Sequence, residues 1–169
     1  MQNHRGFSLI ELLIVIVIIG VIAAIAIPNM LAARRAANEG SSVSSIRTLY
    51  GANVSYSASV GDGNFAGSAD TPGISSLTDL ASAGFIDSSL GLGEKSGFRY
   101  SGDRTEGSIT EPQTFYFSAN PSTPSGILLS GNKRYGVMTD GVIRFDSTLS
   151  DLGVAFDAVS LAAASPLEN

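Results

Sequence analysis

Glu11 is the residue whose type and position most directly suggest chemistry, because it is a carboxylate inside a long apolar run. Between Phe7 and Ile27 the only polar side chains are those of Ser8 and Glu11. An unpaired carboxylate inside a hydrocarbon layer is costly and usually has a partner. Two interpretations remain open: Glu11 reaches the membrane interface from its place near the start of the run, or a positive charge is brought to it.

A cut after Gly6 would create such a charge as a new α-amine on Phe7. Within one helix this amine lies only four residues from Glu11. Between two staggered parallel helices, the amine of one copy meets Glu11 of the next. Pairing the two charges offsets the desolvation that each would suffer alone.

The element that carries these residues is predicted to be a membrane-spanning helix. Residues 7–27 form an apolar run of 21 residues, which spans roughly 30 Å as a helix, the thickness of a hydrocarbon core. A secretory signal peptide fits badly because its apolar part is shorter and ends in a cleavage site of small residues. Pro28 has no N–H and clashes with the preceding turn, so it predicts a kink or a loosened turn.

The N-terminus resembles that of type IV prepilins, and its short leader resembles the type IVa branch. The resemblance covers residues 5–50 and rests on the letters RGFSLIEL at residues 5–12, the apolar run, and Ala26-Ile27-Pro28. It implies that prepilin peptidase cleaves after Gly6 and N-methylates Phe7, and that Glu11 sets the register of the incoming subunit. It also implies that the stretch from Gly20 to Pro28 unwinds in the filament, whereas the residues alone predict an ordinary kinked helix.

Beyond Pro28 the pattern predicts an amphipathic helix that ends near Ser59. Apolar or small residues at helical spacing form one stripe, which consists of Leu31, Val43, Ile46, Tyr50, Val54 and Ser57. The predicted organisation is a leader at 1–6, a membrane or filament-core helix at 7–29, an amphipathic helix at 30–59 and a globular head at 60–169.

The head is predicted to hold about four antiparallel strands packed on this helix, which makes the fold class α+β. The candidate strands lie at 97–101, 114–118, 134–139 and 142–146, and Asp140-Gly141 predicts a type I′ hairpin turn. Ser76 and Asp79 predict a capping box for a short helix that Gly84 ends. The tail from residue 149 has mixed signals. Since the chain has no cysteine, a disulfide cannot hold this region, and hydrogen bonding to the sheet is one alternative.

Enzymatic chemistry has little support in the remaining sequence. The chain has no cysteine and one histidine, and no nucleophile or phosphate-binding motif is complete. The turn-rich residues 61–73 include Asp62, Asn64 and Asp70 but lack the other ligands of a calcium loop. The sequence therefore predicts no enzyme, no cofactor and no metal. Residues 57–169 hold thirteen acidic and six basic side chains, which disfavours nucleic-acid binding.

The resemblance therefore implies a structural protein that polymerises into an extracellular filament used in adhesion, motility or DNA uptake. The implied partners are copies of the chain, prepilin peptidase, the pilus assembly machinery and the bacterial inner membrane, with the N-terminus in the cytoplasm. Charge alone leaves this orientation open, because Arg5 precedes the span whereas Arg34 and Arg35 follow it. Two alternatives are a pseudopilin of a type II secretion system and an anchored binding or enzymatic domain.

Overall fold

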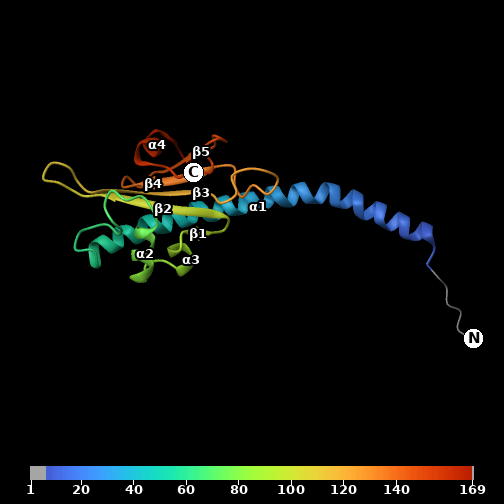
Figure 1. The fold of residues 1–169 in the computed structure, drawn as a ribbon, viewed down its shortest axis with the longest axis horizontal. Helices are drawn as coiled ribbons and strands as arrows, with labels where there is room; N and C mark the ends of the chain where they lie inside the picture. Colours follow the sequence, from blue (N-terminus) through green and yellow to red (C-terminus); the bar gives the residue numbers. More distant parts are fainter. Residues whose placement is uncertain (1–6, 169) are drawn as a thin grey trace, which may run out of the picture. The chain divides into compact units, whose positions relative to one another are not determined.

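The computed structural model describes residues 7–168, so the predicted leader and Gly6 lie outside the described residues. The long helix α1 (Leu9–Ser59) comes first and is followed by two short helices, α2 (Ser75–Ser82) and α3 (Ser88–Gly91). Five strands follow: β1 (Glu94–Lys95), β2 (Phe98–Thr105), β3 (Thr114–Pro121), β4 (Arg134–Met138) and β5 (Ile143–Asp146). Helix α4 (Ala158–Ala163) and strand β6 (Ser165–Pro166) end the series (Figure 1).

The chain divides into two compact units between Arg34 and Arg35, at a point inside α1. In the first unit the described residues form only the opening part of α1. Its large apolar side chains are at least 45% exposed, from Leu9 through Met30. This part of α1 is long and apolar enough to cross a membrane.

The second unit is built on one six-stranded antiparallel sheet whose strands follow one another in chain order. The four predicted strands are all present, and the α+β fold class is confirmed. Two strands of two residues each, β1 and β6, were not predicted and form the sheet edges. Such short edges offer few unpaired backbone groups to other chains.

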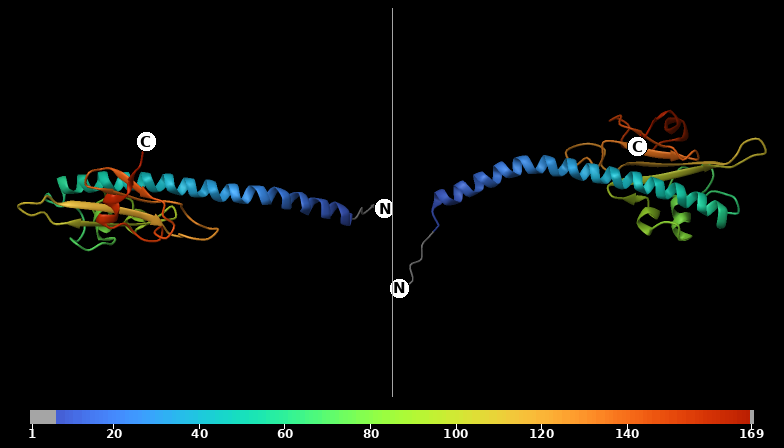
Figure 2. Two further views of the ribbon diagram at one scale, coloured as in Figure 1. Left: turned by 90° about the horizontal axis from the view of Figure 1, so that it is seen from above. Right: turned by 180° about the vertical axis from the view of Figure 1, so that it is seen from behind.

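Strand β3 is the centre of this unit because it is buried on both faces. On one face Phe115, Phe117 and Ala119 pack in the main core, with Ile46 and Leu49 of α1. On the other face Tyr116 packs with Phe156 and Leu161 from the C-terminal segment. Figure 2 shows the sheet between α1 and the C-terminal segment, so the second unit has three layers. Sequence analysis predicted the helix layer but not the second cover.

The predicted apolar stripe of α1 is partly wrong. Ile46 is fully buried as expected, but Val54 is 42% exposed. The buried face of α1 instead consists of Ser42, Ser45, Ile46, Leu49, Ala52 and Asn53. One of these buried polar residues makes a long-range bond: the Asn53 side chain accepts a hydrogen bond from the Ala66 N–H at 2.9 Å, which ties the following loop to the helix.

The predicted capping box of α2 is also wrong. The N-cap residue is Ile74, which makes no side-chain capping bond, and Ser76 is buried. The Asp79 carboxylate instead accepts a hydrogen bond from the Gly67 N–H at 2.9 Å. Docking of the loop onto α2 has therefore replaced the local cap. Gly84 follows the helix end with a φ of 80°, as predicted for a terminating glycine.

The hairpin between β4 and β5 is present, but its turn is not type I′. A type I′ turn needs positive φ at two consecutive residues, whereas only Gly141 has positive φ in this loop. The Gly141 N–H donates to the Met138 carbonyl oxygen at 2.9 Å, so the turn encloses Thr139 and Asp140. Gly141 then supplies the left-handed residue, and the loop between β4 and β5 spans residues 139–142, two residues more than predicted.

The C-terminal tail is held by hydrogen bonds, which was one alternative to a disulfide that the sequence left open. The Phe156 N–H donates to the buried Ser118 hydroxyl at 2.8 Å. The Leu167 N–H donates to the Ile143 carbonyl oxygen at 2.8 Å. Between these two points, Asp157 and Ser160 form a capping box that starts α4. The tail is thus attached to β3 on one face of the sheet, and it pairs with β5 as the edge strand β6.

Candidate processing and assembly segment

The start of α1 brings Glu11 next to Ser8. Ser8 directly precedes the helix, and its backbone N–H donates to Glu11 Oε2 at 2.9 Å. This is the return bond of a capping box, in which the residue three positions into the helix satisfies the N–H of the capping residue. Glu11 therefore has a role within its own helix, in addition to the two interpretations that the sequence left open.

The position of Glu11 also suits its charge. The first turn of a helix carries the positive end of the helix dipole, which stabilises a carboxylate there. Phe7 lies immediately before Ser8 and is 79% exposed. A free amine on Phe7 would be one residue from the N–H that Glu11 already accepts. The arrangement can therefore hold an anion at the helix start and present it to an ammonium group from the same chain or a neighbouring one.

Gly20 and Pro28 both lie within α1, whose bounds include them without a break. A side chain added at Gly20 would meet no atom of the described residues within 4 Å. Nothing in the single chain therefore requires a glycine at this position. Pro28 leaves the carbonyl of Ala24 without its helical donor. Unwinding between these two residues stays a prediction about the filament.

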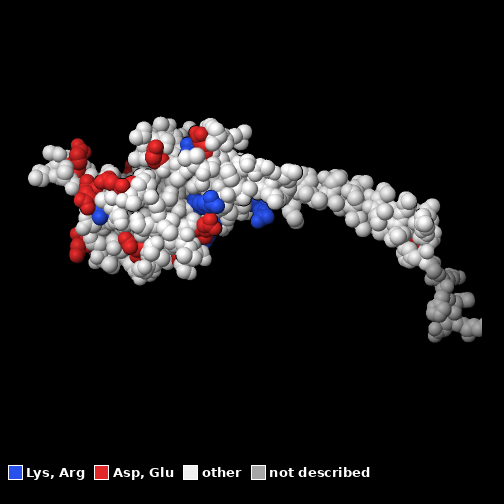
Figure 3. Space-filling model, viewed as in Figure 1, with Lys and Arg blue, Asp and Glu red and all other residues white. Residues whose placement is uncertain are grey.

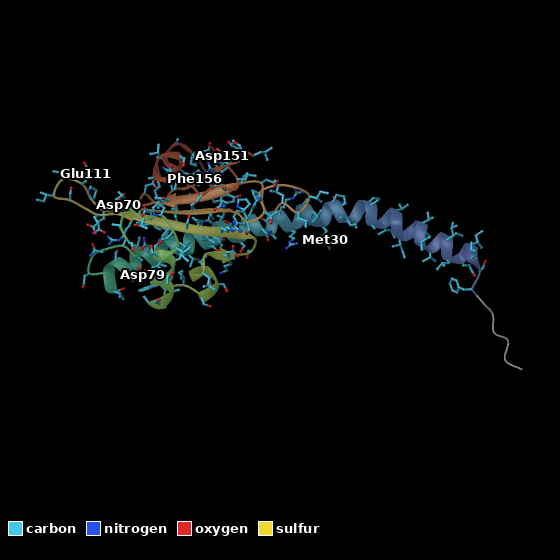
Figure 4. All side chains as sticks on the ribbon, viewed as in Figure 1. Met30, Asp70, Asp79, Glu111, Asp151 and Phe156 are labelled. Atoms are coloured by element: carbon cyan, nitrogen blue, oxygen red, sulfur yellow. The ribbon has the colours of Figure 1, made fainter. Side chains whose placement is uncertain are left out.

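The second unit has a different electrostatic centre at Arg134, which sequence analysis missed. Its guanidinium is nearly buried and donates to Asp146 Oδ2 at 2.7 Å and to the Val154 carbonyl oxygen at 3.1 Å. It also stacks on the Phe156 ring at 4.1 Å from the ring centroid. One side chain thus joins β4, β5 and the C-terminal segment. Figure 4 labels Phe156 and Asp151 within this region.

Neighbouring groups shift the pKa values of two carboxylates and one tyrosine in the second unit. Burial on its own raises the pKa of Asp146, but hydrogen bonds from Thr148 and Arg134 outweigh it and lower the pKa below 3.8. A hydrogen bond from Arg144 lowers the pKa of Asp140 in the same direction. The pKa of Tyr135 is raised by burial and by the neighbouring Glu39 carboxylate, to which its hydroxyl donates at 3.2 Å. These are structural interactions of the fold.

The predicted site residues are therefore placed as follows. Phe7 and Glu11 lie together at the helix start, Gly20 and Pro28 follow along the same helix, and Gly6 is outside the described residues. Ser8 was not predicted as a site residue, although the spacing of Ser8 and Glu11 is that of a capping box directly before an apolar run. No local signal marks Arg134, because its partners are distant in sequence.

Comparison with known proteins supports the prediction for the N-terminal part. Residues 1–27 match the family described as "Prokaryotic N-terminal methylation motif". The chain is 64% identical over 39 residues to the type IV wide pilus major component PilA4 of Thermus thermophilus, covering 23% of this chain and 30% of that protein. It is 43% identical over 54 residues to the type IV major pilin protein PilA of Myxococcus xanthus, covering 32% and 24%.

A protein of secretion systems is also similar. The type II secretion system core protein G of Klebsiella pneumoniae is 42% identical over 52 residues, which cover 31% of this chain and 37% of that protein. The chain thus matches between about a quarter and somewhat over a third of the length of these relatives. No solved structure matches the chain.

The matches are confined to parts of the chain, and the motif among them falls where sequence analysis placed it. The chain therefore carries the prokaryotic N-terminal methylation motif at residues 1–27, and its similarity to type IV major pilins first and a type II secretion core protein second confirms the predicted resemblance to the type IV pilins.

Proposed function

We propose that this chain is a structural subunit of a type IV pilus. Prepilin peptidase cleaves after Gly6 and methylates the new amine of Phe7. The subunit is stored in the inner membrane with its N-terminus in the cytoplasm, and it polymerises through residues 7–28 into an extracellular filament. The observation that carries this proposal is an uncovered apolar helix that begins inside a methylation motif.

The physical argument rests on the surroundings that this helix requires. Ile16 is 59% exposed and Ile22 is 61% exposed, and their neighbours along the helix are similar. A continuous apolar surface of this size is unstable in water. Lipid can cover it before assembly, and the helices of sister subunits can cover it afterwards. Because one apolar environment replaces the other, burial of the helix changes the free energy little on assembly. Charge pairing at Glu11 can therefore decide the register.

The N-terminal amine is the natural partner of Glu11 in that exchange. In the single chain Glu11 accepts the Ser8 N–H, and an ionised carboxylate has two oxygens that accept several hydrogen bonds. Glu11 can therefore keep its capping bond while it receives the Phe7 ammonium group of a neighbour. Two buried charges that pair in this way offset their desolvation.

Substitution of Glu11 and of Gly6 tests the proposal in the producing cell. Glu11→Ala should abolish surface filaments while the membrane-bound pool remains. Glu11→Gln is the matched variant, because it keeps the side-chain length and an acceptor for Ser8 but removes the charge. Gly6→Ala should leave the leader attached, which intact-mass spectrometry detects. Normal filaments from Glu11→Ala would overturn the register role.

A second candidate function is that of a pseudopilin in a type II secretion system. The similarity to the core protein G of Klebsiella pneumoniae supports it. The two functions differ in the product, because a pseudopilin would remain in a short periplasmic structure. Mechanical shearing of intact cells separates them. This chain in long sheared fibres, with the N-terminal mass of methylated Phe7, supports the pilus subunit, and its absence from them together with a secretion defect supports the pseudopilin.

A further inference from the structure

The hairpin between β2 and β3 projects from the second unit and carries an exposed apolar side chain at its tip. Ile109 lies in this tip and is fully exposed. Glu106 and Glu111 flank it on the two arms, and both are exposed. Figure 3 shows acidic side chains gathered at this end of the unit, and Figure 4 labels Glu111 there. The tip therefore presents one apolar group between two negative charges.

The tip is held in a defined shape. The Ser108 N–H donates to the Glu111 carbonyl oxygen at 2.8 Å, and the Glu111 N–H donates to the Ser108 hydroxyl at 3.0 Å. At the base of the hairpin, the hydroxyls of Thr105 and Thr114 are hydrogen-bonded at 2.6 Å. A pre-organised loop loses little conformational entropy when it binds. Ile109 is thus presented on a rigid support.

A pocket of complementary character lies beside β5 and β6. It has a volume of about 440 Å³. Its lining consists of Lys133, Phe145, Ser165, Pro166, Leu167 and Glu168. The apolar walls suit an aliphatic side chain, and Lys133 lies 4.4 Å from the centroid of the Phe145 ring. Glu168 also lines the pocket, but within residues 7–168 Lys133 forms no ion pair with it or with another carboxylate. The Lys133 charge is therefore available to a carboxylate from another copy.

The tip and the pocket lie at opposite ends of the sheet. Thr105 pairs with Thr114 at the end of β2 and β3 that carries the tip. Strand β4 pairs with β3 through Tyr135 and Ala119, so Lys133 lies near the far end of β3. The intervening length of β3 is roughly 25 Å at the usual rise per residue. The tip of one copy therefore cannot enter its own pocket.

We propose that the Ile109 tip of one copy inserts into the Lys133 pocket of a second copy, with Glu111 facing Lys133. Ile109 then contacts Phe145 and Leu167. Because the two surfaces differ and lie at opposite ends of one unit, the contact is head to tail. Such heterologous contacts do not close on themselves unless a rotation forms a ring, and they generate open filaments. This inference rests on the proposed filament function and assigns a contact between its globular heads.

Cysteine cross-linking tests the contact directly, because the chain has no cysteine of its own. Full-length subunits that carry both Ile109→Cys and Ser165→Cys are assembled in the producing cell and oxidised with diamide. We expect a ladder of covalent multimers that reduction removes. Ile109→Cys with Ser89→Cys is the matched control, since Ser89 is exposed on α3 and does not line the pocket. It should cross-link about tenfold less.

A charge exchange tests the same contact without cysteine. Glu111→Lys or Lys133→Glu alone should lower the filament yield on the order of fivefold, and the two together should restore it. Filaments that form without a ladder, or a double variant with no rescue, would overturn the head contact while the pilus function stands. A ladder containing a second protein would also overturn it. A wild-type cell without filaments would instead contradict the proposed function.

Discussion

The two parts of α1 show how one helix can serve two environments. In the first unit the large apolar side chains are exposed from Leu9 through Met30. In the second unit, from Arg35 onward, the same helix buries Ile46 and Leu49 completely beneath the sheet. The stability of the second unit comes from contacts within the chain. The large apolar side chains from Leu9 through Met30 stay exposed, and this difference separates the folded head from the segment that we propose to assemble.

The two units also use charge differently. Glu11 is the only acidic residue in the first unit, and its carboxylate is tied to the helix start. In the second unit Arg134 is enclosed by Asp146, the Val154 carbonyl and the Phe156 ring. The Arg134 charge has several partners within the unit and stabilises its fold. The Glu11 carboxylate accepts one hydrogen bond from the protein and can still bind an incoming group.

The largest expected effect comes from a buried leucine of α1, compared with an exposed leucine of the same helix. Leu49→Ala should lower the free energy of unfolding of the second unit by about 3 kcal/mol, because a fully buried leucine leaves a cavity. Leu13→Ala should leave that free energy unchanged, since Leu13 is 50% exposed. Urea unfolding of full-length subunits in detergent, followed by circular dichroism, measures both. Equal losses would mean that the two parts of α1 unfold as one.

Removal of Arg134 should have the next largest effect. Arg134→Leu should lower the free energy of unfolding by about 2 kcal/mol, because Asp146 Oδ2 and the Val154 carbonyl oxygen lose the hydrogen bonds that Arg134 donates. Arg99→Leu is the control, since Arg99 makes an exposed ion pair with Glu94. Hydrogen exchange should locate the loss in the C-terminal segment. Unchanged protection there would show that Arg134 is not what holds it.

The cap of α4 should have a smaller effect. Asp157→Ala should cost about 1 kcal/mol, because the Asp157 carboxylate accepts the Ser160 N–H at 2.7 Å as the N-cap of the helix. Asp157→Asn keeps an acceptor and should retain most of the stability. The same urea titration measures both variants. A loss as large as that of Arg134→Leu would mean that the whole tail detaches with α4.

The smallest effect is expected from pH. The pKa of Asp146 lies below 3.8 in the folded chain, so protonation favours the unfolded state. Its contribution is complete above the unfolded pKa near 3.8 and is lost as the pH falls through the lower folded pKa. Unfolding titrations between about pH 6 and pH 3 should show this decrease, and Asp146→Asn should make it shallower. An unchanged slope in Asp146→Asn would assign the acid sensitivity to other carboxylates.

Local patterns were sufficient for much of the fold. The apolar run, the helix end at Ser59 and the four main strands follow from periodicity and β-propensity. Local rules failed where a distant segment competed for the same side chain. Asp79 binds the Gly67 N–H instead of capping α2, and Asn53 is buried to hold Ala66. Neither partner can be recognised from the neighbouring residues.

The proposed assembly segment and the head differ in the same way. The spacing of Glu11 from Gly6 and Phe7 is a property of the sequence itself, and the helix that begins at Leu9 places the Glu11 carboxylate in its first turn. Only the tertiary structure decided three other features. These are the burial of β3 on both faces, the surroundings of Arg134, and the location of the hairpin tip and the Lys133 pocket at opposite ends of the sheet. These features join residues that are far apart in the chain, and only the packing of the sheet brings them together or holds them apart.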